Sequence, residues 1–498
     1  MAKRTRIKPT GRAVRFGFAV WGAIWMAGCA GWRGVRQPEP VLSPPQYLQT
    51  ESTEPFSDQP WWPAFGDTTL TQLMEEAFTE NLTLEQAVAR LDQFRASRAA
   101  ARSSWFPTIR ADVSVMDNGD VGDAESAAPD PFSSGALSSE SLSALMSPSR
   151  YSAGLTAAYE LDAWGRLAAG RTAASADLFT GRENLRALTL TLAAQVARTY
   201  YIIVELKLQR DLLERTIASY TDSYELVLHR YRRGVAPSLD VYQAETNLAG
   251  ARAQMALTAS NLYTAEHGLA VLLGRYPRCN LVAAGTMLPE GFDDVPPGLP
   301  SELVQRRPDV RAAYWKFVAA DRRAAEAVAA RLPSFSLTGT VTGENDDLAD
   351  ALDPNSMVWN AVGKLILPVF EGGRRKANAD RAEAAWREQA ASYKQAVLNA
   401  FQEVEDALVR ANRQKEYIVQ LSTQARAAEA SLRLATDRYL RGLSDYLPVM
   451  VAQATYFNAS RGRLSAHRGL VDAHIGLVTA LGGGWTDAVI REHTTAGR

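Results

Sequence analysis

Two copies of one unit follow each other along this chain. Gly165-Arg166 recurs as Gly373-Arg374, an offset of 208 (373 − 165 = 208). The same register holds for Arg230-Tyr231 and Arg438-Tyr439, Gly234 and Gly442, Val241 and Val449, Leu262 and Leu470, and Leu273-Gly274 and Leu481-Gly482. Such a repeat predicts one structural unit used twice. Because Pro107 matches Pro333 at the larger offset of 226 (333 − 107 = 226), the first copy is longer between Pro107 and Gly165, which predicts a longer loop there.

Each copy carries a very long helix followed by a turn and a second helix. Residues 166–231 contain no proline, and their apolar positions recur about every 3.5 residues, the spacing of a coiled-coil seam. The stretch 373–439 repeats the pattern. Glycine-bearing turns follow, RRGVAPSLDV at 232–241 and LRGLSDYLPV at 440–449. The sequence therefore predicts two helical hairpins, with long helices reaching about 100 Å at about 1.5 Å per residue.

Strand patterns precede each long helix. In residues 151–163, apolar residues alternate with small or polar ones over about a dozen positions. Similar strands are predicted near 107–117, 333–342 and 357–369, although the last alternates poorly because Val362 and Ile366 share a face with Asn360 and Lys364. Alternation of this length fits strands of a membrane barrel, and equally a half-buried sheet in a soluble domain.

Strand number separates these two alternatives. Four strands per chain cannot close a barrel, because about eight is the smallest number that does, and hydrocarbon does not tolerate an open sheet edge. A membrane barrel would therefore need two or three copies of the chain, with three giving twelve strands and a wider interior. Long hairpins joined to such strands would continue the barrel as a helical tube, which predicts passage through it.

The chain begins with a targeting pattern. Residues 1–15 are basic without acids, and the apolar run after them is too short to span a bilayer, so 1–28 is predicted to be a signal peptide. The run ends Met26-Ala27-Gly28-Cys29, which resembles the bacterial lipoprotein box and predicts a covalent lipid on Cys29. Residues 29–60 are polar and proline-rich, which predicts a lipid-anchored tether.

Composition excludes several classes of function. Lys and Arg total 54 against 55 Asp and Glu, so no basic surplus favours nucleic acid. Two cysteines and five histidines leave little material for a metal centre, and His467 and His474 are expected to be packing or surface residues. No catalytic arrangement stands out, and no stretch after residue 29 approaches the length of apolar sequence that a membrane helix needs. We therefore expect no enzyme, no cofactor besides the lipid, no metal and no transmembrane helix in the mature chain.

Several long motifs, in order, resemble the TolC-like outer-membrane efflux proteins, and more closely their NodT-type lipoprotein branch. The likeness covers nearly the whole mature chain. It rests on WWPAFGDTTLTQLMEEAFTENLTLEQAVARL (61–91), YRRGVAPSLDVYQAE (231–245), LPSELVQRRPDVRAA (299–313), LPVFEGGRRKA (367–377) and ALGGGW (480–485).

The resemblance implies a mainly α fold with a membrane β-barrel portion. It implies a homotrimer whose twelve strands continue into a coiled-coil tunnel, with the barrel in the outer membrane and the tunnel in the periplasm. Such proteins are the passive exit duct of tripartite pumps that export drugs or other toxic small molecules. Their partners are a periplasmic adaptor and an inner-membrane RND-type transporter.

The resemblance also suggests site residues. The two turns would lie at the periplasmic tip and dock the adaptor through Gly234 and Gly442 with Arg233 and Arg441. Acidic rings close the tunnel in members of the family, which makes Asp437 the candidate for the constriction and Asp445 a second one. A glycine that simply ends a helix, and an Asp that is simply a solvated charge, remain open alternatives.

The repeat and the motifs together define the expected domains. They are the signal peptide 1–28, the tether 29–60, the first repeat 61–274, a linker 275–300, the second repeat 301–485 and a tail 486–498. Two other functions stay open at this point: a duct for type I protein or oligosaccharide secretion, and a soluble periplasmic coiled-coil scaffold.

Overall fold

The computed structural model describes most of the chain. The described residues are 34–39, 44, 46–48, 59–116, 150–283, 285–292, 295–345, 347–483, 485–487 and 489–490. The predicted signal peptide, Cys29 and the end of the predicted tail from 491 onward lie outside them.

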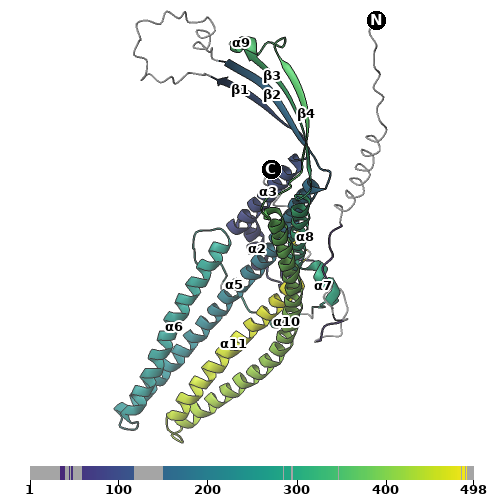
Figure 1. Ribbon diagram of the computed structural model, residues 1–498. Helices are drawn as coiled ribbons and strands as arrows, with labels where there is room; N and C mark the ends of the chain where they lie inside the picture. Colours follow the sequence, from purple (N-terminus) through teal and green to yellow (C-terminus); the bar gives the residue numbers. More distant parts are fainter. Residues whose placement is uncertain are drawn as a thin grey trace, which may run out of the picture. The chain divides into compact units, whose positions relative to one another are not determined.

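Four strands form one antiparallel sheet in the order β1-β2-β3-β4, drawn as a curved ribbon in Figure 1. They are β1 (Thr108–Met116), β2 (Arg150–Leu161), β3 (Ser334–Asn345) and β4 (Val358–Ile366). The four predicted strands are therefore confirmed. Among the described residues each strand pairs only with its sequence neighbours, so β1 and β4 are the two edges of this sheet.

The two faces of the sheet differ in polarity. Residues paired across strands share a face. One such row consists of Ala111, Leu155, Val341 and Trp359, and the next row consists of Arg110, Thr156, Thr340 and Asn360. At one end of this face α9 (Leu348–Ala351) contacts β2 and β3, and Ala153 is 2% exposed there. Elsewhere the apolar side chains are open within the described residues, since Leu155 is 54% exposed and Trp359 is 76% exposed. Most of the apolar face is thus uncovered in the single chain.

The weak alternation of β4 has a simple origin in the register. Val362 pairs with Thr338 and Ile366 with Ser334, so both lie on the polar face together with Asn360 and Lys364. The predicted exception is therefore confirmed, and the polar face carries apolar residues near this edge.

The helices come in three matched pairs, one member from each repeat. The pairs are α3 (Leu82–Ser103) and α8 (Pro308–Ala329) with 22 residues each, α5 (Arg166–Arg232) and α10 (Arg374–Leu440) with 67 each, and α6 (Ser238–Leu272) and α11 (Leu447–Leu481) with 35 each. Shorter elements are η1 (Trp62–Phe65), α2 (Thr68–Glu80), α7 (Pro300–Arg306) and α9 (Leu348–Ala351). Equal lengths in all three pairs confirm the internal repeat.

The loops account for the difference between the copies. The connection from β1 to β2 spans 117–149, all outside the described residues, whereas the connection from β3 to β4 spans only 346–357. In the opposite sense, the connection from β2 to α5 (162–165) is slightly shorter than that from β4 to α10 (367–373). The first copy is therefore longer before its long helix, and the β1–β2 connection is the longer loop that the two repeat offsets predict.

The described residues divide into two compact units that cut across the repeats. The first takes in the described residues of 34–37, 95–116, 150–176 and 318–388, and it contains the sheet with the adjoining ends of four helices. The second takes in the described residues of 38–94, 177–317 and 389–490, and it contains both hairpins and the main apolar core. In that core, Trp62 meets Trp485 edge to face at 4.8 Å, and Tyr200 and Ile475 are fully buried.

One helix within the described residues, α5, is long and apolar enough to cross a membrane by length and composition. Of its most apolar 18-residue window, 61% is buried inside the protein. Ile203 and Val204 of α5 belong to the main core, and a core helix passes the same test. We therefore assign this part of α5 to the core of the second unit.

Candidate functional site at the hairpin ends

The two helix-ending turns have the same backbone geometry. Gly234 has φ +76° and Gly442 has φ +72°, the left-handed region that favours glycine. The amide of Val235 donates to the Arg230 carbonyl at 2.9 Å, and the amide of Leu443 donates to the Arg438 carbonyl at 2.9 Å. These bonds, with those of the two glycine amides to residues three positions earlier, form a Schellman cap at each helix end.

Both turns are shorter than predicted. The predicted turns 232–241 and 440–449 are wrong at their C-terminal ends, because α6 begins at Ser238 and α11 at Leu447. Pro237 is the extended residue just before α6, and Pro448 lies in the first turn of α11. Proline is favoured at a helix start, where its missing N–H costs nothing, so these prolines begin the second helices earlier than the pattern suggested.

An apolar cluster joins the ends of the two hairpins. Its buried members come from both: Val227, Ala244, Tyr439, Tyr446 and Val449. The rings of Tyr439 and Tyr446 lie 5.6 Å apart, and Tyr446 is 1% exposed. Burial raises the pKa of Tyr446 to about 12, which keeps its hydroxyl protonated.

Polar contacts add to this cluster. The guanidinium of Arg230 donates to the Tyr439 carbonyl at 2.9 Å, and the Gln453 amide donates to the Ser223 hydroxyl at 2.7 Å. Each contact connects α5 with the second hairpin. The tips of the hairpins are thus held to each other by side chains that no single hairpin could bring together.

The predicted site residues are solvent-exposed. Arg233, Gly234, Arg441 and Gly442 are exposed on the two turns. The Asp437 carboxylate is paired with the Arg441 guanidinium at 3.0 Å, and both side chains are more than half exposed. Within the single chain, Asp437 forms a surface ion pair with Arg441, which lies four residues later. Its place in an acidic ring stays a prediction.

Asp445 lies close enough to Asp240 to affect the pKa of the Asp240 carboxyl. Burial and the nearby Asp445 carboxylate together raise the pKa of Asp240. Asp240 is in the first turn of α6, so a carboxylate from each hairpin lies in this region. Asp445 itself is exposed.

Apolar side chains around the turns were missed by sequence reasoning. They are exposed by more than half: Val235, Leu239, Tyr242, Leu440, Leu443 and Leu447. Grouped exposed apolar residues mark interaction sites. Their signal was present in both turn sequences, where apolar residues alternate with glycine, proline and acids instead of giving way to a polar loop.

The remaining sequence signals find structural explanations. His474 is stacked on Phe292 at 4.2 Å, and burial lowers its pKa to about 4. Among the described residues, no group of three or more His, Cys, Asp or Glu could hold a metal ion. Gly482 ends α11 with φ +77°. Cys279 is a free, exposed thiol whose Sγ lies 3.7 Å from Nε2 of His267.

Comparison with known proteins agrees with this architecture. The family model described as outer membrane efflux protein matches residues 73–275 and 299–483, one stretch for each repeat. The solvent efflux pump outer membrane protein SrpC of Pseudomonas putida is 30% identical over 425 residues, covering 85% of this chain and 87% of SrpC. The probable outer membrane lipoprotein SilC of Salmonella typhimurium is 26% identical, covering 93% of this chain and 97% of SilC.

A solved structure shows the same fold. The open state of the MtrE outer membrane channel of Neisseria gonorrhoeae matches with a TM-score of 0.75 and 29% identity, covering 91% of this chain and 98% of that one. The TolC-like fold predicted from the sequence is thereby confirmed. With a family model matching both repeats, the chain belongs to the outer membrane efflux protein family.

Proposed function

We propose that three copies of this chain form one closed channel, a twelve-stranded barrel in the outer membrane that continues into a helical tunnel. The chain is an outer-membrane efflux protein by its family. The trimer, the cargo and the partners are the parts of the function proposed here.

The open, two-faced sheet is the observation that carries the proposal. Within the described residues most of the apolar face is exposed, and β1 and β4 are edges that lack a neighbouring strand on one side. In hydrocarbon each such group costs several kcal/mol, so the edges must pair with strands of neighbouring copies. Closure places the apolar row of Leu155 and Val341 toward lipid and the polar row of Thr156 and Thr340 toward the lumen.

The hairpin ends are the proposed docking site of a periplasmic adaptor. The exposed apolar side chains around Gly234 and Gly442 offer a surface for another protein, with Arg233 and Arg441 beside them. Through the adaptor, the channel would receive cargo from an inner-membrane RND-type transporter. The cargo would be drugs or other toxic small molecules, in keeping with the solvent efflux named for SrpC.

Conduction through the proposed channel is passive, with the energy supplied by the transporter. Cys29, outside the described residues, is the proposed site of a covalent lipid. Replacing Cys29 by Ser removes the only thiol at the predicted cleavage point and is expected to abolish metabolic labelling with palmitate.

Two neighbouring residues in the middle of β2 provide a test of the barrel. Leu155 belongs to the apolar face and Thr156 to the polar face. Arg at a lipid-facing midplane position costs about 2–4 kcal/mol, whereas lumen positions tolerate charge. Leu155→Arg should therefore reduce the trimer extracted by detergent from outer membranes, as measured by light scattering coupled to size exclusion, and Thr156→Arg should not.

The same preparation distinguishes the other candidate functions. A monomer released without detergent would mean a periplasmic scaffold and would overturn the channel. A trimer that restores drug resistance to a pump-deficient strain supports the proposal. A trimer that restores only secretion of a protein or polysaccharide would support the proposed channel and contradict the proposed cargo.

A further inference from the structure

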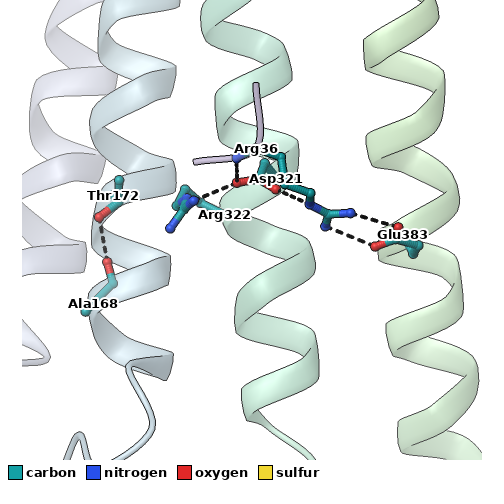
Figure 2. A network of polar contacts seen from close by, with 6 residues as sticks. All are labelled: Arg36, Ala168, Thr172, Asp321, Arg322 and Glu383. Atoms are coloured by element: carbon teal, nitrogen blue, oxygen red, sulfur yellow. Dashed lines mark hydrogen bonds and ion pairs between the residues drawn. The ribbon is translucent and has the colours of Figure 1, made fainter. Parts of the chain in front are cut away.

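A short N-terminal segment is bound to two helices of the first unit. The Nε atom of Arg36 donates to Oδ1 of Asp321 on α8 at 2.6 Å, and its two terminal nitrogens donate to the Glu383 carboxylate on α10 at 2.9 and 3.0 Å (Figure 2). The guanidinium also lies 3.7 Å from the ring centroid of Trp386. These groups, Asp321, Glu383 and Trp386, form what we call the Arg36 site.

The Arg36 site gives the guanidinium both hydrogen-bond acceptors and an aromatic ring to stack on. A bidentate carboxylate, a second carboxylate and an aromatic face are the three kinds of partner that arginine binds better than lysine. Asp321 is 4% exposed at its side chain, so this contact is not an ordinary surface pair. The hydrogen bond from Arg36 lowers the pKa of the Glu383 carboxyl. The segment is therefore held at a defined point and is not a free tether there.

Further contacts continue along α10. The Glu39 carboxylate pairs with Lys394, and the amide of Leu48 donates to Oε1 of Glu405 at 2.8 Å. The α10 positions 383, 394 and 405 are evenly spaced by eleven (394 − 383 and 405 − 394), which is about three helical turns, so they share one face of the helix. The segment formed by residues 36–39 and 47–48, here called the strap, thus follows one stripe of α10.

Chain length relates the strap to the membrane. Cys29 precedes Arg36 by seven residues (36 − 29), which reach at most about 24 Å when extended. Asp321 lies eight residues before α8 ends (329 − 321) and Glu383 nine residues after α10 begins (383 − 374), or about 12–14 Å along each helix. Short connections join those helix ends to β3 and β4. The segment from Cys29 to Arg36 can therefore extend about 10 Å beyond the length of helix between the Arg36 site and these helix ends.

We propose that the Arg36 site is the docking point of the acylated chain end, which holds the strap on α10 while the lipid on Cys29 enters the same bilayer as the strands. This inference rests on the proposed lipidation and barrel. The chain would then be attached to the membrane at two places, through the lipid on Cys29 and through the barrel strands. The number of residues between Cys29 and Arg36 is the quantity that the docking point constrains.

Crosslinking in membranes tests the proposal. Glu39→Cys and Lys394→Cys, in a Cys279→Ser background, place two thiols where the ion pair lies, and a short bismaleimide should join them. Arg36→Ala should lower the yield several-fold, and Arg36→Lys should lower it less because one charge remains. Deleting residues 31–34 leaves three residues before Arg36 (7 − 4), a reach of about 10 Å, shorter than the helix segment to be passed.

The matched controls separate length from chemistry. Shortening should lower crosslinking in the acylated protein, while inserting four residues at the same place should leave it unchanged. A version exported by a cleavable signal peptide without Cys29 should crosslink normally at all three lengths. Equal crosslinking of the shortened and full-length acylated chains would overturn the proposal, and so would the absence of any crosslink at full length. Absence of palmitate label on Cys29 would refute the proposed lipidation. In that case, crosslinking of the version without Cys29 would still test whether the strap lies on α10.

Discussion

Arg230 of the first hairpin binds Tyr439 of the second in two ways. Its Nη1 atom donates to the Tyr439 carbonyl at 2.9 Å, and its guanidinium carbon lies 4.5 Å from the centroid of the Tyr439 ring. The carbonyl belongs to the last turn of α10 and also accepts the Gly442 amide at 3.0 Å, so Arg230 adds a second donor to it. One side chain of the first hairpin therefore contacts both the backbone and the ring of Tyr439 in the second.

Replacing Arg230 should loosen the hairpin ends. We expect Arg230→Ala to cost about 1–3 kcal/mol, since a charged hydrogen bond and a cation–π contact are both lost. The expected readout is faster proteolysis at the turns, followed by mass spectrometry of the fragments. Arg438 occupies the equivalent position of the second repeat and is exposed, so Arg438→Ala is the matched control. Equal sensitivity of both variants would contradict the contact.

Long elements could be predicted from the sequence and their exact ends could not. The proline-free run from Arg166 and its copy from Gly373 predicted helices that the structure begins within one residue, at Arg166 and Arg374. The starts of α6 and α11 were missed because a helix start depends on single residues such as Pro237, while periodicity is spread over many.

The sequence predicted the turn residues of the candidate site but not the contacts between the two hairpins. The glycines at positions 234 and 442 could be found because a left-handed helix end is a property of the chain itself. The burial of Tyr446 and the contact of Arg230 with Tyr439 depend on how two hairpins pack, and no spacing in the sequence encodes that. The strap was missed because proline-rich composition indicates extension and says nothing of a binding partner.

A glycine pair in the second hairpin tests the turn geometry. Gly442 has φ +72°, and a Cβ there would meet no atom within 4 Å, so Gly442→Ala introduces backbone strain alone, about 1 kcal/mol. Gly462 lies within α11 with equally open surroundings, so Gly462→Ala should instead stabilise by about 0.5–1 kcal/mol. Thermal unfolding of the detergent-extracted protein should move in opposite directions. A shift in the same direction would refute the strain.

Arg307 should be important for the stability of the second unit. It is 6% exposed, donates to the Ala480 carbonyl at 2.9 Å, and binds both Asp309 and Glu403. We expect Arg307→Ala to cost about 3 kcal/mol, the lower end for a buried pair because both carboxylates are half exposed. Arg307→Lys keeps the charge without the planar fork and should recover only part of the loss, measured by unfolding midpoints. Full recovery by lysine would mean that charge alone matters.

His474 should make stability depend on acid. Burial, with Lys415 nearby, lowers its pKa from 6.5 to about 4. Between these two pH values the imidazole is protonated in the unfolded chain and neutral in the folded chain. The contribution of neutral His474 to the free energy of unfolding is therefore complete above pH 6.5 and is lost as the pH falls toward about 4. The full loss is about 3 kcal/mol. His474→Phe should flatten the decline of the unfolding midpoint between about pH 7 and about pH 4.5, and an unchanged slope would exclude His474 as its source.

Charge variants at the second turn test the predicted constriction. Asp437 and Arg441 neutralise each other in the structure, so removing either one leaves the other charge uncompensated. If three copies place these residues around one axis, Asp437→Asn should shift selectivity toward anions and Arg441→Gln toward cations. A unit charge about 4 Å away in water is worth about 1 kcal/mol, so the permeability ratio from reversal potentials in planar bilayers should change about two- to fivefold.

Asp445→Asn is the control for that measurement, because Asp445 is exposed and lies outside the ion pair of Asp437 with Arg441. A change confined to the Asp437 and Arg441 variants places the constriction at their helical turn. A change only with Asp445→Asn moves it to the second candidate. Unchanged permeability ratios in all three variants would mean that these residues are ordinary surface charges, and the narrowest part of the tunnel would have to be sought elsewhere along the hairpins.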